Sequence, residues 1–136
     1  MSDVLINPAR VRRVKPLSAE EVVSAVERAL LTEVRLTPKP GLVDIRKAGA
    51  HWDMDLASFE ASTAVVAPWM EKFFIMGHDT AAVAPEQVLM MLRPVGMACE
   101  NDMLEATGGV NTHRGAIFAF GLLSAAAGRL VSKGEP

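Results

Sequence analysis

The sequence predicts an all-α fold, a helical bundle. Three observations lead to this prediction. Apolar residues recur at helical spacing in several segments, capping and helix-breaking residues separate those segments, and no segment alternates in the manner of a strand. The 136 residues are 50% hydrophobic and 22% charged, which suits one folded domain. We divide the chain into a flexible lead-in, 1–17, and a helical domain, 18–136.

The first helix is predicted to begin after Ser18. Ser18 and Glu21 have the spacing of a capping box, in which each side chain bonds the other's backbone amide. The segment TPKPG, residues 37–41, ends the helix because two prolines and a glycine cannot continue it. Apolar residues recur at helical spacing between these limits, at Val22, Val23, Val26, Ala29, Leu30 and Val34.

A polar loop, residues 37–55, precedes a second helix predicted over about 56–76. Asp55 is able to cap this helix, and Pro68 is expected to kink it. Its apolar side is predicted to carry Phe59, Val66, Trp69, Met70 and Phe73.

A third helix is predicted from Pro85 to Leu92, with a kink or interruption at Pro94 before it continues to Ala106. A glycine turn over 107–112 leads to a last helix, about 113–131, that is apolar almost all round. Such a helix is expected to be buried on every side. It must therefore pack centrally, or further protein must cover it, as in a fragment or an oligomer.

Charge and cysteine content exclude several classes of function. A net charge of −2 gives no basic field for nucleic acid. A lone cysteine, Cys99, rules out a disulfide framework within the chain and favours a reducing compartment. The longest apolar run, 116–127, is shorter than the roughly 20 residues that span a bilayer. We therefore expect a cytoplasmic protein without a membrane partner.

The loop 37–55 gathers side chains suited to phosphate and a hard metal. Lys39 is a point charge, while Asp44, Asp53 and Asp55 offer the oxygen ligands that Mg²⁺ prefers, and His51 lies close by. The alternative is that Asp55 caps a helix and the other side chains are simply solvated.

Glu100 falls inside the apolar arc of residues 95–106 when these are placed on a helix. A carboxylate there is costly unless it is paired or binds a cation. It is either a functional group or a core carboxylate paired with an arginine such as Arg93. The neighbouring methionines, including Met90, Met91, Met97 and Met103, are interpreted as core filling, and Cys99 as a small hydrophobe.

Residues 107–115, TGGVNTHRG, form the third polar cluster. Gly108 and Gly109 allow the backbone to approach a ligand, and Asn111 or Thr112 is able to cap the final helix. The free amides of a helix start attract anions, and His113 and Arg114 add donors. The alternative is an ordinary glycine turn with a good cap. The histidines His51, His78 and His113 lack zinc-type spacing.

Three stretches together resemble one enzyme family. They are residues 31–44 (LTEVRLTPKPGLVD), 49–55 (GAHWDMD) and 92–118, which contains LRPVGMACE and TGGVNTHRGAIF. The family is the ATP:dephospho-CoA triphosphoribosyl transferases, which serve citrate lyase and, in a related branch, malonate decarboxylase. The run from Ala84 to Glu100 is more similar to the citrate branch. Family members are roughly double this length, so the chain is expected to be an N-terminal half. They also usually have lysine where this chain has Arg114.

The resemblance implies a transferase that moves the triphosphoribosyl group of ATP to the ribose of 3′-dephospho-CoA, which releases adenine and forms 2′-(5″-triphosphoribosyl)-3′-dephospho-CoA. It implies catalysis by Glu100 with His51 and Asp44, and Mg²⁺ held by Asp53 and Asp55. Phosphate is then held by Lys39, Gly108, Gly109, Asn111, Thr112, His113 and Arg114. The fold is expected to be half of a larger all-helical domain, completed by a C-terminal half or by a homo-oligomer. The alternatives are an inactive nucleotide- or CoA-binding module and a self-associating structural fragment.

Overall fold

The computed structural model describes residues 15–36 and 56–134. These ranges contain helices and no strand, so the predicted all-α fold is confirmed. Residues 1–14 lie outside the described ranges, and the division between lead-in and domain stays a prediction. The helices are α2 (Ala19–Arg35), α3 (Leu56–Asp79), α4 (Pro85–Ala106) and α5 (Arg114–Ser132).

The capping box at the start of α2 is confirmed. The Ser18 hydroxyl accepts from the Glu21 amide at 3.2 Å, and the Glu21 carboxylate accepts from the Ser18 amide at 2.9 Å. Two orphan donors of the first turn are thereby satisfied. Buried residues then recur at Val22, Val26, Leu30 and Val34. Their spacing of four places them in one stripe, so α2 has a single apolar face.

The two internal prolines do not divide their helices. α3 continues past Pro68 to Asp79, three residues beyond its predicted end. α4 is one helix from Pro85 to Ala106, so of the kink or interruption predicted at Pro94 the interruption is wrong, and the kink stays a prediction. Both prolines are exposed, and each leaves the carbonyl four residues earlier without its usual helical donor. Packing along the rest of each helix outweighs this local loss.

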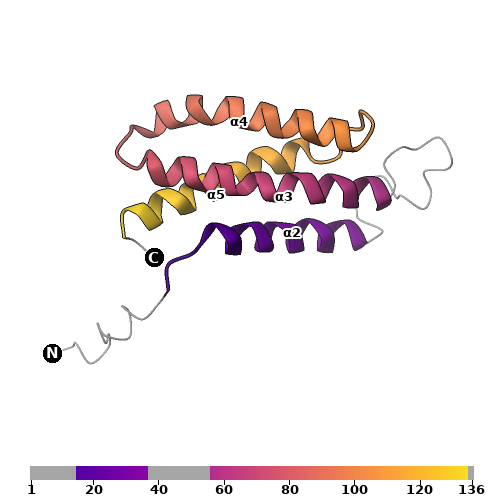
Figure 1. The fold of residues 1–136 in the computed structure, drawn as a ribbon, viewed down its shortest axis with the longest axis horizontal. Coiled ribbons are helices and arrows are strands. Elements are labelled where there is room, and N and C mark those ends of the chain that lie inside the picture. The colour runs from indigo at the N-terminus through magenta and orange to yellow at the C-terminus, as the bar shows by residue number, and fades with distance from the viewer. Residues whose placement is uncertain (1–14, 37–55, 135–136) are drawn as a thin grey trace.

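Consecutive helices run in opposite directions, and α3 lies between the other three (Figure 1). It packs against α2, α4 and α5, whereas α4 and α5 have a smaller contact with each other. The core is therefore built around α3. Its most completely buried large side chains are Leu30, Val66, Met70, Met103 and Ile117.

Glycines bring α3 and α5 into close contact. A methyl group placed on Gly128 would lie 2.0 Å from the carbonyl oxygen of Phe74, and one on Gly77 would lie 1.9 Å from that of Ala125. Neither backbone atom is able to move away as a flexible side chain would. The two helices therefore meet backbone to backbone at these points.

Two predictions about burial are wrong. The helix expected to be buried on every side, α5, exposes Phe118, Leu122, Leu123 and Leu130. Of the four methionines interpreted as core filling, only Met103 is buried, while Met90, Met91 and Met97 are exposed. Both differences have one cause, because α4 and α5 each turn a single face toward α3 and leave the opposite face uncovered by the described residues.

Candidate functional site

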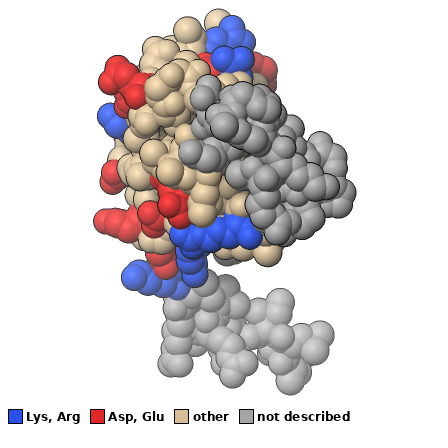
Figure 2. Space-filling view, turned by 90° about the vertical axis from the view of Figure 1, so that its right-hand side faces the viewer, with Lys and Arg blue, Asp and Glu red and all other residues tan. Residues whose placement is uncertain are grey.

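One end of the bundle brings distant parts of the sequence together. The C-terminal ends of α2 and α4 and the N-terminal ends of α3 and α5 lie there, on the right of Figure 1. Arg35 at the end of α2 pairs with Glu60 near the start of α3, with 3.1 Å between nitrogen and oxygen. Figure 2 looks onto this end and shows acidic and basic side chains interspersed on the described surface. We call it the turn end, after the turn between α4 and α5.

The turn itself depends on two glycines. Gly108 and Gly109 have φ of 68° and 95°, in the left-handed region that glycine adopts without strain. The Thr107 hydroxyl donates to the Val110 carbonyl at 2.7 Å and accepts from the Val110 amide at 3.1 Å. The turn is thus closed by its own residues. A methyl group on either glycine would meet no atom within 4 Å, so the described residues leave open space beside both.

The cap of α5 differs from the prediction. The helix starts at Arg114 with His113 in the N-cap position, and the His113 side chain makes no capping bond. Thr112 does not cap either, since its hydroxyl donates to Ser62 at 2.6 Å. Asn111 does serve the helix start, because its side-chain oxygen accepts from the Arg114 amide at 3.2 Å. Of the two predicted capping residues, Asn111 is therefore the one that bonds the first turn.

His113 is buried rather than displayed to a ligand. Its Nδ1 shares a hydrogen bond of 2.6 Å with the Ser62 hydroxyl, and the edge of Phe59 meets its ring at 5.4 Å between centroids. Burial lowers the pKa of His113 below its ordinary value, and the Coulomb attraction of Glu33 opposes this only in part. The ring is therefore neutral near pH 7. The prediction that His113 and Thr112 donate to phosphate is not supported, because both are engaged with Ser62 inside the protein.

Glu100 and Arg114 form an ion pair between α4 and α5. The Arg114 Nε donates to the Glu100 carboxylate; 18% of the Glu100 side chain and 57% of the Arg114 side chain are exposed. The prediction that an arginine pairs with Glu100 is thus correct, but the partner is Arg114 and not Arg93. The Glu100 side chain is mostly covered at the turn end, whereas the Arg114 side chain reaches the surface. A ligand at this end would meet an acidic and a basic group side by side.

The neighbouring carboxylate, Asp102, has a different role. It accepts from the Trp69 indole nitrogen at 2.8 Å, and the Lys72 ammonium lies 4.8 Å from the centre of the Trp69 ring. The bond from Trp69 to Asp102 ties α3 to α4, whereas the Lys72 contact lies within α3. Asp102 therefore serves the packing of the bundle, whereas Glu100 faces the turn.

The sequence model of the ATP:dephospho-CoA triphosphoribosyl transferases matches residues 19–136. The chain belongs to this family. The predicted resemblance is thereby confirmed over nearly the whole chain, and the turn end carries the third of the stretches on which it was based, residues 92–118.

Named relatives of the family align with all or most of the chain. One from Klebsiella pneumoniae, called 2-(5″-triphosphoribosyl)-3′-dephosphocoenzyme-A synthase, is 99% identical over 136 residues, which are 100% of this chain and 45% of the relative. A probable synthase from Salmonella gallinarum is 68% identical over the same shares. One from Albidiferax ferrireducens is 53% identical over 86% of this chain and 39% of its own length. The chain thus spans less than half the length of these relatives. No solved structure matches it.

The first two family stretches lie largely outside the described residues. This applies to Lys39, Asp44, His51, Asp53 and Asp55, whose predicted roles stay predictions. The residues on either side of this segment, Leu36 and Leu56, are described and belong to the turn end. The chain therefore leaves and re-enters the described bundle at the end where Glu100 and Arg114 lie.

Within residues 15–36 and 56–134, no group of three or more acidic, histidine or cysteine side chains is placed to hold a metal ion. The predicted ligands of the family site, Asp53 and Asp55, are in the segment outside these ranges.

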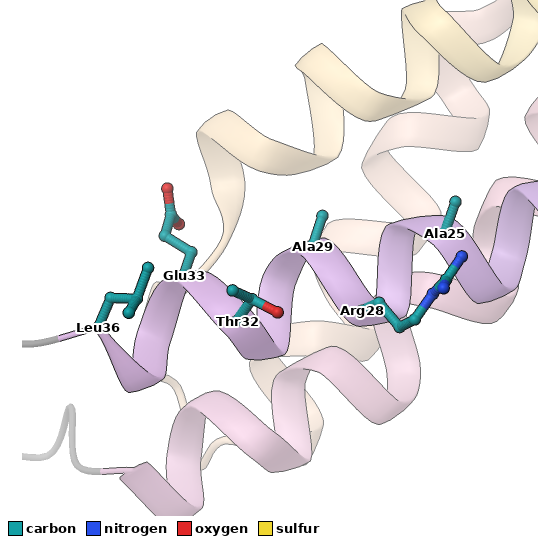
Figure 3. Close-up of a pocket in the computed structure, with 6 residues that line it drawn as sticks. All are labelled: Ala25, Arg28, Ala29, Thr32, Glu33 and Leu36. Atoms are coloured by element: carbon teal, nitrogen blue, oxygen red, sulfur yellow. The ribbon is translucent and has the colours of Figure 1, made fainter.

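A surface hollow of about 580 Å³ lies along α2, from Ala25 to Leu36 at the turn end. Its lining residues all come from α2 or the residue after it, and Figure 3 shows Ala25, Ala29 and Glu33 projecting from one side of that helix. None of the predicted site residues lines it. Among the described residues, only those of α2 and Leu36 line this hollow, and we assign it no function.

Ser62 is the site residue that sequence analysis missed. It is fully buried in α3 and accepts the Thr112 hydroxyl while it bonds His113, so it fastens the turn to the core. The signal was present, because Ser62 lies three residues after Phe59 and four before Val66, in the same apolar stripe. A polar residue in such a stripe needs a buried partner.

Proposed function

We propose that this chain is the catalytic N-terminal half of a transferase that forms 2′-(5″-triphosphoribosyl)-3′-dephospho-CoA from ATP and 3′-dephospho-CoA. Family membership and the names of the relatives support this proposal. The structural observation that carries it is the pairing of Glu100 with Arg114 beside the glycine turn.

The pair suits the charges that the reaction develops. Breaking the bond between ribose and adenine builds positive charge on the sugar, and a carboxylate beside that carbon would stabilise it. Glu100 is also able to accept the proton of the attacking ribose hydroxyl of dephospho-CoA, while adenine leaves. Its ion pair with Arg114 orients the carboxylate before the substrate binds. In this proposal Glu100 acts at the sugar, and His51 and Asp44 assist from the neighbouring segment.

Arg114 is proposed to bind the triphosphate. A guanidinium has five N–H donors, and the bond from Nε to Glu100 does not exhaust them. Asn111 is exposed in the same turn, and its side-chain NH2 group is able to donate to phosphate oxygens. The amides of Gly108 and Gly109 already donate to the Glu105 and Leu104 carbonyls, so these glycines would contribute open space beside the phosphate and not donors. Lys39 would add a further cation. Magnesium, held by Asp53 and Asp55, would neutralise phosphate charge when it enters with ATP.

The finer parts of the proposal concern the setting of the enzyme. We assign the product to the prosthetic group of citrate lyase rather than that of malonate decarboxylase, on the likeness of residues 84–100 to the citrate branch. A cytoplasmic location agrees with the single cysteine and with the use of ATP as a substrate.

Adenine release tests the proposal. The full-length Klebsiella pneumoniae relative, incubated with ATP, dephospho-CoA and Mg²⁺, should release adenine, and the exchange corresponding to Glu100→Gln should lower kcat at least about a hundredfold. The matched control is Glu105→Gln, an exposed carboxylate five residues further along α4, which should leave kcat unchanged. Unchanged turnover by the Glu100 variant would remove this residue from the chemistry.

The same assay distinguishes the alternative of a non-catalytic nucleotide- or CoA-binding module. Such a module would be stabilised against heat by Mg-ATP without release of adenine by either the short chain or the full-length protein.

A further inference from the structure

The outer face of α5 is apolar from Gly115 to Leu130. Its buried face, turned toward α3, consists of Ile117, Gly121, Ser124, Ala125 and Gly128. The exposed residues from 115 to 130 recur at intervals that keep them on the opposite side of the helix, and none of them is charged: Gly115, Phe118, Ala119, Leu122, Leu123, Ala126 and Leu130. Arg129, the single charged residue between them, is half-buried and donates to the Thr80 carbonyl at 3.2 Å.

α4 extends this surface. The Phe118 ring lies against Gly96, where an added methyl group would be 3.3 Å from a ring carbon. Leu89 lies two helical turns before Gly96 and Met97 directly follows it, so exposed apolar side chains of α4 border Phe118. We define the outer patch as the exposed residues Leu89, Met97, Phe118, Leu122, Leu123, Ala126 and Leu130. A soluble monomer rarely leaves so continuous an apolar surface in water.

By length and composition α5 is able to cross a membrane. Its longest apolar run, residues 116–127, is shorter than a bilayer requires, but the whole helix is longer than that run. The packing points to another use. Gly128 and Gly77 hold α5 against α3 backbone to backbone, so one side of the helix belongs to the bundle. A membrane-spanning helix is surrounded on every side by protein or lipid. In this chain the described residues cover one side of α5 and leave only its outer face uncovered.

The relatives indicate what covers the outer patch. This chain spans 45% of the Klebsiella pneumoniae protein, so the remaining 55% of that protein must fold against or beside it. Arg114 lies one turn before Phe118, so the patch is continuous with the turn end and a segment seated on it would reach the candidate site. A segment in the same polypeptide also has a high effective concentration, which favours it over a second copy.

We propose that the outer patch is an internal interface of the full-length enzyme, covered by an apolar helical face from the part of the relatives that this chain does not span. In the full-length protein Leu123 and Ala126 are core residues, although in this chain they are exposed. The inference rests on family membership and packing, and not on the proposed transfer reaction. Its test measures stability, so its failure is distinguishable from a failure of the proposed activity.

The test compares one substitution in two lengths of chain. Leu123→Glu and Ala126→Glu should leave the Tm of the short chain unchanged within about 2 °C, because both positions face solvent there. At the corresponding positions of the full-length Klebsiella pneumoniae relative, each should lower Tm by about 5 °C or more, because the new carboxylate would be buried. The matched control is Ala64→Glu, on an exposed face of α3 shared with Glu71 and Lys72, which should change Tm equally in both lengths.

Three outcomes would overturn the proposal. The first is a full-length protein whose Tm is insensitive to both substitutions. The second is a short chain that forms a dimer in light scattering and that Ala126→Glu dissociates, while the Tm of the full-length protein does not respond to either substitution. The occupant of the patch would then be a second copy. The third is binding of the full-length protein to phosphatidylcholine vesicles that Leu123→Glu abolishes, which would assign the patch to a lipid surface.

Discussion

His113 shows how the chemistry of a residue depends on its surroundings. In the sequence it stands among turn residues beside Arg114, a setting that predicts an exposed donor. In the structure it is 5% exposed, bonded to Ser62 and covered by Phe59. Burial lowers its pKa, so the imidazole that holds the turn to α3 is the neutral form. His113 is thus a structural residue of the turn end, and Arg114, next to it, is the exposed cation.

The lowered pKa of His113 predicts that acid destabilises the protein. The unfolded chain binds a proton at the ordinary pKa of 6.5, whereas the folded chain resists it until a lower pH. The free energy of unfolding should therefore be constant above about pH 7 and fall as the pH drops from 6.5 toward the lowered value. Urea denaturation between pH 8 and pH 5.5 measures this, and His113→Asn should flatten the slope. An equally steep slope in that variant would assign the effect to another group.

Among the helices, α3 and α5 are the most tightly joined. Gly77 and Gly128 allow their backbones to touch, while the glycine of the α5 first turn, Gly115, faces open space. α2 is fixed differently, by its capping box and by an apolar stripe of four residues. The position of α5 therefore depends on glycines that have no side chain at the contact with α3. The position of α2 depends on its apolar side chains and on its capping residues.

Alanine substitutions at two glycines of α5 should have opposite effects. Gly128→Ala should destabilise the protein by about 2 kcal/mol, because its methyl group would overlap the Phe74 carbonyl and force the helices apart. Gly115→Ala meets no atom within 4 Å and should be neutral or stabilising by up to about 1 kcal/mol, since alanine favours the helix. Chemical denaturation measures both. Equal effects would contradict the close contact seen at Gly128.

The whole molecule is a bundle centred on α3, with its core sealed and one outer surface apolar. Cys99 lies in that core with no exposed surface. Burial, together with the negative charges of Asp102 and Glu100, raises the pKa of its thiol to about 12. Because the thiolate is the reactive form, the native protein should be inert to thiol reagents.

Labelling of Cys99 should consequently report on unfolding of the entire bundle. With Ellman's reagent at pH 8, the native chain should react at least about a thousandfold more slowly than the denatured chain, with a rate that rises with denaturant. The matched control is Cys99→Ala combined with Ala64→Cys, whose exposed thiol should react at once. Rapid labelling of native Cys99 would show that the core around α4 opens locally.

Local patterns were sufficient to predict the helices and most of the core. The capping box at Ser18 and the repeats of Val22, Val26, Leu30 and Val34 specify α2 without reference to any other helix, and the order of the elements is correct throughout the described ranges. The family was also apparent from short stretches of sequence, because its motifs combine unusual residues in a set order. Such features depend only on neighbours along the chain.

Contacts between residues that are distant in the sequence could not be predicted from those local patterns. Periodicity placed Glu100 in an apolar arc but could not show that it pairs with Arg114. It also could not show that Ser62 forms a hydrogen bond with His113, fifty-one residues away. The same reasoning predicted that α5 is buried on every side, whereas its packing on α3 leaves the outer patch exposed. Which face of a helix is covered, and which charge a carboxylate meets, depends on how the helices assemble, because burial and Coulomb energies act between surfaces that sequence spacing does not relate.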